Sequence, residues 1–550
     1  MTRLGSNGSA TRWHSQLSRE RRTSGACGLH RRAFAAILFV LLAGLVCFRV
    51  IDFAHRLLSP DIAAVAFAEG GDDGYYYFTV ARNIATGHGI TIDHIHWTSG
   101  FQPLWMAVCA AAFLVPERAA LALLYIFSLA CWIISAGLIV RFARNALGRP
   151  TPVLATLAIS AIFMCDEQIF FQYFNGMETG LAITLTLYLL LAVQRYLQAG
   201  LQPSSLRVSL GLGIIVSLTL LARNDTVFLC VALLGLIAFA GDRRRALRDA
   251  VVIVFVATTL LLPWLFYCQW VYGVPVPQSG IATSAALRGG HPVATFTYQA
   301  LLDAVTPILS AGQHNLMLAY PGLTSITVAI AAIGFVIAWS RAPRPGLGRA
   351  TTLVLAALVS SCVPLVLYYS LFSGAGHFFV RYFLPLKLLI LILLSLLIAH
   401  AFTQCRPRAV SRIIPAMAIL CMLVGIVTAD FRIWRDFGRP YLLYMGEFAH
   451  DVPRLPFWAG TRRIGMAESG RLGYLLPDRV VNLDGKMRPD ALRALSTRTM
   501  ADFLRDLDID CILLANFDVY YFDHNSPGWR EHFGDAKPYK HYFIFEKKRM

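Results

Sequence analysis

Long apolar runs, separated by short and mostly basic segments, constrain this chain more than any other feature of its sequence. Several runs approach the length of about 20 residues that an α-helix needs to cross a bilayer, for example residues 33–50, 179–197 and 352–372. The hydrophobic share is 57% and the charged share only 15%, far below the charged share of soluble domains. We therefore predict a polytopic α-helical membrane protein.

The charges between the runs predict how many of them cross the membrane. Basic loops of membrane proteins face the cytoplasm, and this holds throughout if residues 102–115 form an interfacial helix rather than a span. Arg141, Arg144 and Arg149 then lie inside, together with the later basic loops. The eleven predicted spans are residues 33–50, 119–140, 152–164, 179–197, 208–221, 227–240, 251–267, 323–339, 352–372, 384–402 and 413–428.

The same topology divides the chain into three parts. Residues 1–32 are rich in Arg, Ser and Gly and predict a disordered cytoplasmic N-terminus. Residues 33–430 form the membrane domain, in a cytoplasmic (inner) membrane of bacterial type, and residues 52–118 form a large first external loop. Residues 431–550 predict a small α/β domain outside, with strands at 479–483 and 511–515, a helix at 499–507 and a final edge strand at 541–545.

The net charge of +17 does not indicate a nucleic-acid partner. Most of the excess Arg falls in short loops between apolar runs, where it is a topology signal of membrane proteins. The expected surroundings are therefore membrane lipids, with no nucleic acid.

The first external loop holds the most concentrated group of candidate catalytic residues. Asp72 and Asp73 precede a predicted helix at 75–86, so one of them is expected to cap free N–H groups at its start. The other carboxylate is free to take a proton from a hydroxyl nucleophile. It could instead bind a divalent cation such as Mg or Mn, and Glu69 could assist in either role.

Three histidines on the same loop are weaker candidates. His94 and His96 would face the same way on a strand, a spacing compatible with a metal site, and His88 lies nearby. A polar loop that contacts ligand or lipid headgroups is the commoner explanation for histidines in such a pattern.

Charged residues also gather at the predicted outer ends of spans. Each could pair with a neighbour or reach the membrane surface, but together they predict an outward-facing cavity with carboxylates and cations on its walls. Cations at that depth suit a lipid-linked phosphate. The charged residues concerned are Glu178, Arg223, Asp225, Arg381 and Lys387, and Tyr382 lies next to Arg381 in the sequence. In the external domain, residues 482–485 (NLDG) indicate a turn that could also bind sugar.

Several of these motifs resemble the GT-C glycosyltransferases, membrane enzymes that take sugars from polyprenyl-phosphate donors. The resemblance covers most of the chain and is most specific in the first external loop. Its motifs are DDGYY at 72–76, ARN at 81–83, GHG at 87–89, GFQPLW at 100–105, GME at 176–178, RND at 223–225, RY at 381–382 and NLDG at 482–485. Relatives often have His where this chain has Gln102.

The resemblance implies an inverting transfer of a sugar to a glycan, lipid or protein acceptor outside the membrane. Asp73 or Asp72 would be the general base, and Arg223, Arg381 and Lys387 would stabilise the phosphate leaving group. Aromatic side chains would stack on sugars or anchor the loop in the interface. The expected substrate-binding residues are Glu69, Tyr75, Arg82, His88, Gln102, Trp105, Glu178, Arg223, Asp225, Arg381, Tyr382 and Lys387.

Two other classes of protein remain open at this point. A transporter or flippase for lipids or small molecules would place charged residues within spans and show internal repeats. A non-enzymatic factor in envelope assembly would need no paired carboxylates beside a cavity.

Overall fold

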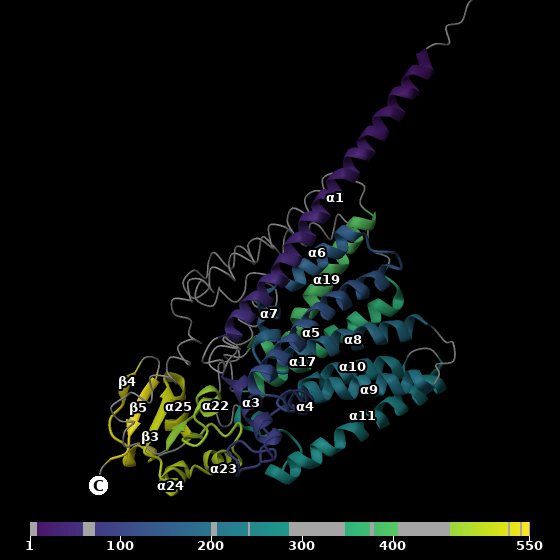
Figure 1. The fold of residues 1–550 in the computed structure, drawn as a ribbon. Coiled ribbons are helices and arrows are strands. Elements are labelled where there is room, and N and C mark those ends of the chain that lie inside the picture. Colours follow the sequence, from purple (N-terminus) through teal and green to yellow (C-terminus); the bar gives the residue numbers. More distant parts are fainter. Residues whose placement is uncertain are drawn as a thin grey trace, which may run out of the picture.

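The computed structural model describes residues 8–58, 72–199, 206–239, 242–284, 347–373, 379–404, 463–525, 528–539 and 542–548. Figure 1 shows a bundle of helices and, at one end of it, a smaller part that contains the strands. Helices α3 (Asp73–Ala85) and α4 (Pro103–Ala112) lie where the two parts meet.

The helices of the bundle coincide with the apolar runs. Every predicted span that falls in the described part of the chain is helical, whereas residues 323–339 and 413–428 lie outside it. By length and composition, five described helices can cross a membrane: residues 32–57 of α1, and α5, α8, α11 and α17. The bundle helices are α1 (Gly8–Leu57), α5 (Glu117–Leu147), α6 (Val153–Met164), α7 (Glu167–Phe174), α8 (Thr179–Gln198), α9 (Leu206–Ala222), α10 (Val227–Ala238), α11 (Arg243–Tyr272), α17 (Arg349–Phe372), α18 (Phe379–Tyr382) and α19 (Leu384–Gln404).

Two segments near the N-terminus differ in length from their predicted elements. Helix α1 begins at Gly8 and so runs through most of the segment for which disorder is predicted. The interfacial helix predicted at 102–115 is the shorter α4, which starts with Pro103 in its first turn. Proline suits that position because the N–H it lacks would have no partner inside the helix.

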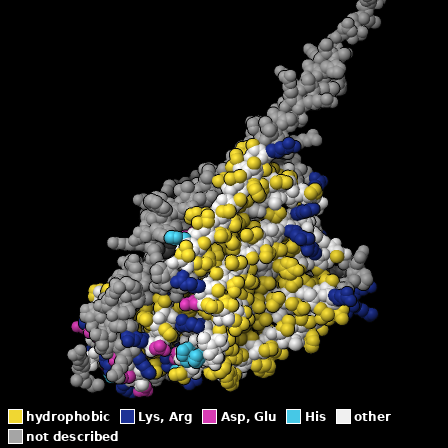
Figure 2. Space-filling view, in the orientation of Figure 1, with side chains coloured by type: hydrophobic (Ala, Val, Ile, Leu, Met, Phe, Trp, Pro, Cys, Tyr) yellow, Lys and Arg dark blue, Asp and Glu magenta, His cyan; other side chains and the backbone are white. Residues whose placement is uncertain are grey.

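The bundle has a basic end opposite the strand-containing part. Gln194 of α8 donates to Phe142 O of α5 and to Thr351 Oγ1 of α17, so these three helices meet there. Lys and Arg side chains gather along this edge of the apolar surface (Figure 2). The described arginines on the segments that meet there include Arg141, Arg144, Arg195, Arg243, Arg244, Arg245 and Arg349.

The C-terminal part is an α/β domain around a five-stranded sheet of order β2-β1-β3-β5-β4. Strand β1 pairs in parallel with β2 and β3, and β5 pairs antiparallel with β3 and β4. The fully buried β3 is the predicted strand 511–515. The described elements are β1 (Ile464–Met466), α22 (Gly470–Leu475), β2 (Val480–Asn482), α23 (Pro489–Thr497), α24 (Met500–Asp506), β3 (Cys511–Ala515), α25 (Asn516–Asn525), β4 (Lys537–Tyr539) and β5 (Tyr542–Glu546).

One prediction for this domain is wrong. Residues 541–545 are expected to form an edge strand, but β5 has partners on both sides and lies inside the sheet. The edge belongs to β4, whose three residues include Pro538. Proline has no N–H to donate to a ladder, so an edge position is where it is tolerated.

Candidate active site

Asp73 lies in the first turn of α3 and is bound by two cations that come from distant parts of the chain. Its Oδ2 is 3.2 Å from Arg381 Nη2, and its Oδ1 is 3.0 Å from Lys486 Nζ. Burial alone would raise the pKa of this carboxyl, but the charges of Lys486 and Arg381 outweigh burial and lower it below its ordinary value. Asp73 is therefore ionised at neutral pH.

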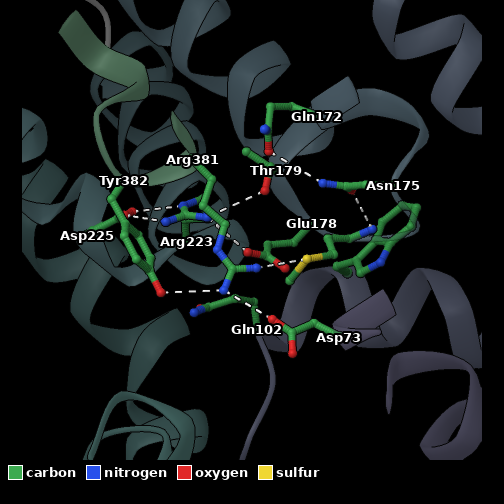
Figure 3. A network of polar contacts seen from close by, with 12 residues as sticks. Asp73, Gln102, Gln172, Asn175, Glu178, Thr179, Arg223, Asp225, Arg381 and Tyr382 are labelled. Carbon is green, nitrogen blue, oxygen red and sulfur yellow. Dashed lines mark hydrogen bonds and ion pairs between the residues drawn. The ribbon is translucent and has the colours of Figure 1, made fainter. Parts of the chain in front are cut away.

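Arg381 is held in place from three sides by its own contacts. Besides Asp73, its guanidinium contacts Met177 Sδ through Nη1 at 2.9 Å and Tyr382 Oη through Nη2 at 3.4 Å. Figure 3 shows the guanidinium lying between Asp73, Glu178 and Tyr382. The ring of Tyr382 stacks on Tyr369 at 4.2 Å between centroids, which fixes that wall of the site.

Lys486 is the member of this cluster that the sequence analysis missed. It follows the turn after β2, where Asp484 Oδ1 accepts from the backbone N–H of Lys486 at 2.8 Å. Its Nζ lies 3.0 Å from Asp73 and 3.6 Å from Asp484 Oδ2, and the side chain is 5% exposed. The only signal for it in the sequence is its place directly after the NLDG motif.

Asp72 caps a helix, but not its own. Its carboxylate accepts from the backbone N–H groups of Gly470 and Arg471, the latter at 2.7 Å, at the start of α22 in the α/β domain. Burial raises the pKa of Asp72 to about 6, although these two hydrogen bonds act in the opposite direction. Asp72 therefore connects the first loop to the α/β domain, which leaves Asp73 as the carboxylate that faces the cations.

Tyr76 makes a second connection between the first loop and the α/β domain. Its hydroxyl accepts from Ser469 N at 3.1 Å and from Asn482 Nδ2 at 3.0 Å. It lies 3.3 Å from both Ala467 O and Asp484 Oδ2, to either of which it can donate. The NLDG motif thus lies at the boundary between the two parts of the protein.

A second ionic network lies next to Arg381 (Figure 3). Arg223 bonds Asp225 through two nitrogens and Glu178 Oε1 through Nη1 at 3.1 Å. Glu178 Oε2 accepts from the Tyr77 hydroxyl at 2.8 Å, and Tyr77 Oη accepts from Gln102 N at 2.9 Å. The network joins the ends of α8 and α9 to the first loop. Its charged members and Gln102 were predicted, whereas Tyr77, Tyr369 and Thr179, which also bond into it, were not.

Lys387 is a predicted phosphate ligand that the structure does not bring to this cluster. Its Nζ lies 2.8 Å from Asp166 Oδ2, with exposed side-chain fractions of 2% and 0%. Asp166 also caps α7 by accepting from Ile169 N. The ion pair is sealed inside the bundle, so the charge of Lys387 is used within the protein.

The predicted aromatic residues and Arg82 take structural positions. Tyr75 and Trp105 are each 1% exposed, so neither ring offers a face to a ligand in this structure. Trp105 Nε1 donates to Gly176 O at 3.0 Å. Arg82 donates to Tyr474 O at 3.1 Å and lies over its ring, which adds a further contact with the α/β domain.

The three histidines turn to different partners instead of lining one face of a strand. His94 has φ of 65°, which no strand residue adopts, and its Nε2 lies 3.0 Å from Asn83 Oδ1. His96 Nδ1 pairs with Asp93 at 2.8 Å, and the ring of His88 stacks on that of His94. The predicted pairing of His94 and His96 on a strand is therefore wrong.

The surroundings of Asp73 do not fit a divalent cation. Both of its oxygens are taken by positive groups, which a metal ion would have to displace. Among the described residues, no group of three or more His, Cys, Asp and Glu side chains could hold a metal. Glu69, the other carboxylate predicted to assist, lies outside the described residues.

No protein-family model and no curated protein sequence matches the chain at a significant level. Solved structures that the chain resembles over most of its length include ArnT and an archaeal oligosaccharyltransferase. ArnT from Cupriavidus metallidurans, bound to undecaprenyl phosphate, is 13% identical over 90% of this chain and 97% of its own, with a TM-score of 0.42. The oligosaccharyltransferase of Archaeoglobus fulgidus, in complex with Zn and sulfate, is 14% identical over 87% of this chain and 69% of its own, with a TM-score of 0.38.

Proposed function

We propose that this protein is a membrane glycosyltransferase that moves a sugar from a polyprenyl-phosphate donor to an acceptor hydroxyl. The observation that carries the proposal is Asp73, a carboxylate that is 13% exposed and is held between Arg381 and Lys486. A carboxylate can accept the proton of a hydroxyl nucleophile, and two adjacent cations can bind a phosphate leaving group. The motifs of the first external loop resemble those of GT-C glycosyltransferases. This resemblance is the reason to propose a sugar as the transferred group.

In the proposed reaction, the acceptor oxygen attacks the anomeric carbon while Asp73 takes its proton. The bond between that carbon and the phosphate oxygen breaks, and its electron pair leaves with the phosphate. Attack from the side opposite the phosphate inverts the anomeric configuration. Arg381 and Lys486 lie where they can neutralise the charge that develops on the leaving group.

Arg381 and Lys486 also affect the basicity of Asp73. While both bind Asp73, its pKa is lowered and it is a weak base. A donor phosphate that engages the same cations would weaken their hold on the carboxylate, so its pKa would rise when donor is bound. In this way donor binding prepares the base for the acceptor.

The basic end of the bundle supports an outer location for the site. Glu178 lies beside Arg381 and Asp73 (Figure 3) and directly precedes α8, whereas Arg195 lies in the last turn of the same helix. Under the positive-inside rule the arginine-rich end faces the cytoplasm. The candidate site and the α/β domain then lie outside an inner membrane of bacterial type.

The test is sugar transfer by purified full-length protein from polyprenyl-phosphate donors that carry different labelled sugars. Asp73→Asn should lower turnover at least a hundredfold, in line with the loss of a general base. Asp502→Asn is the matched control, because Asp502 lies on the surface of the α/β domain with 59% of its side chain exposed. Equal turnover by wild type and Asp73→Asn would rule out this function for Asp73.

A flux assay in liposomes separates this proposal from the transporter alternative. A glycosyltransferase shows no movement of donor across the bilayer that depends on Asp73. Donor flux without transfer to an acceptor would favour the transporter.

A further inference from the structure

Residues 90–98 of the first loop form a short hairpin with an apolar tip. Thr98 N donates to Ile90 O at 3.1 Å where the two arms of the hairpin meet. At the turn, Ile95 is 74% exposed, so most of its surface faces away from the protein. The hairpin contains no Lys or Arg. It therefore presents hydrocarbon, and not positive charge, at its tip.

The turn of the hairpin holds Ile95 in a defined position. Asp93 Oδ1 accepts from the backbone N–H groups of Ile95 at 3.2 Å and of His96 at 2.8 Å. His94 has φ of 65°, a left-handed conformation that is uncommon for any residue except glycine. Its Nε2 lies 3.0 Å from Asn83 Oδ1 of α3. These contacts fix the backbone that carries the exposed isoleucine.

Trp97 connects the hairpin to the end of helix α11. Its ring meets the ring of Trp270 edge to face, with 5.3 Å between centroids. The two residues are 42% and 66% exposed. Tyr267, one turn before Trp270, donates from its hydroxyl to Thr98 O at 2.9 Å. The hairpin therefore lies at the level of Trp270 along α11.

The length of α11 relates this level to a bilayer. By length and composition, α11 can cross a membrane. Its last arginine is Arg248, and the 22 residues from there to Trp270 rise about 33 Å at 1.5 Å per residue. The hydrocarbon core of a bilayer is about 30 Å thick, and tryptophan is enriched at its two boundaries. With Arg248 at one boundary, Trp270 and the hairpin lie at the other.

The α/β domain has a surface of a different kind. Among its described residues, none of the exposed side chains is large and hydrophobic, and the exposed positions include the ion pair of Asp502 and Arg505. That surface suits water. Exposed apolar patches mark sites of protein or membrane contact, and Ile95, Trp97 and Trp270 continue the exposed apolar face of a membrane-crossing helix. This continuity favours lipid over a protein partner.

We infer that the hairpin is a membrane-contact element whose tip enters the headgroup region of the bilayer. Ile95 reaches the ends of the acyl chains nearest the headgroups, and Trp97 lies at the boundary beside Trp270. Because the hairpin contains no Lys or Arg, it binds through apolar surface, and acidic lipids do not strengthen the contact.

The hairpin also touches both sides of the candidate active site. Asn83 of α3, the helix that begins at the candidate base, donates from Nδ2 to Thr91 O at 2.9 Å. On the other side, Asp93 Oδ2 lies 3.3 Å from Nη1 of Arg488, two residues after Lys486. Lipid at the tip therefore supports the element that connects α3 to the α/β domain.

The experiment places an environment-sensitive fluorescent amino acid at single positions of the full-length protein in phosphatidylcholine nanodiscs. The lipid carries bromine, a contact quencher, either near the headgroup end or near the middle of its acyl chains. We expect headgroup-end bromine to quench the reporter at Ile95 at least twofold, and mid-chain bromine to quench it less. Leu260, 45% exposed halfway along the apolar part of α11, should show the opposite order. Asp502, on the α/β domain, should show no quenching.

Several outcomes would overturn the inference. One is a reporter at Ile95 that bromine does not quench while a reporter at Trp270 is quenched, because the hairpin would then lie away from lipid. Another is a reporter at Ile95 shielded from both brominated lipid and aqueous acrylamide, which would show that protein covers the tip. Quenching that rises at least twofold when phosphatidylglycerol is added would assign the contact to charge. None of these measurements requires catalysis, so they test the hairpin separately from the proposed function.

Discussion

Gly470 leaves no room for a side chain beside Asp72: a Cβ on it would overlap the Asp72 carbonyl oxygen. The same holds at Gly100, where a Cβ would overlap the carbonyl oxygen of Lys486. Both glycines lie where the first loop and the α/β domain touch. The two parts of the protein therefore approach each other backbone to backbone at these two points.

We predict that Gly470→Ala separates the α/β domain from the first loop. Overpacking against a backbone costs about 1–3 kcal/mol or more, so sugar transfer should fall at least tenfold. Hydrogen exchange at residues 470–475 should rise. Gly473→Ala, on the same short helix, is the control and should change neither readout.

Asp72 should make the contact between the two parts depend on pH. Its pKa is about 6 in the docked state and about 4 when exposed to water, so docking takes up a proton between these values. Docking should therefore strengthen as pH falls from 7 to 4 and weaken as pH rises through 6. Protease protection of residues 470–475 across this range measures the effect. In Asp72→Asn, this protection should depend less on pH than in wild type.

Arg381→Lys should keep the charge but lose most of the function of Arg381. The guanidinium reaches Asp73, Met177 and Tyr382 together, which a single ammonium group cannot do. Losing hydrogen bonds to a charged group costs about 1.5–3 kcal/mol, so kcat/KM for the donor should fall about 10- to 100-fold. Arg505→Lys, on the exposed surface of the α/β domain, should behave as wild type.

Asp166 and Lys387 should affect stability and leave donor affinity unchanged. Removing one partner of a buried ion pair costs about 3–5 kcal/mol, whereas replacing both is often neutral. Asp166→Asn and Lys387→Met should each lower the Tm of the protein in nanodiscs, and the double variant should recover part of that loss. A raised KM for the donor in a correctly folded Lys387→Met variant would instead assign Lys387 to the phosphate.

The helices could be predicted from the sequence. Of the two cations that bind Asp73, Arg381 could be predicted and Lys486 could not. Apolar runs of the right length identify helices without any knowledge of tertiary contacts, and α8 and α17 follow them closely. The first loop was identified by its polar residues between two apolar regions. Arg381 was identified because several charged residues at predicted span ends fall on the same side of the membrane as the Asp pair.

What the sequence could not predict depends on docking between distant segments. Lys486 bonds a carboxylate 413 residues away, and no local pattern specifies that pairing. Lys387 and Arg381 are both cations at the end of a predicted span. Only the packing of the helices determines that Lys387 is buried against Asp166. Strand β1 has three residues, Ile464–Met466, too few to show an alternating pattern.

The two cations on Asp73 also set an order for the maturation of the protein. Arg381 follows Asp73 by 308 residues and Lys486 follows it by 413. A nascent chain that has not yet delivered the α/β domain to the side of Asp73 holds only part of this arrangement. Docking of the last segment beside Asp73 is therefore the step that completes the cluster, and we expect a chain truncated before residue 463 to insert and remain inactive.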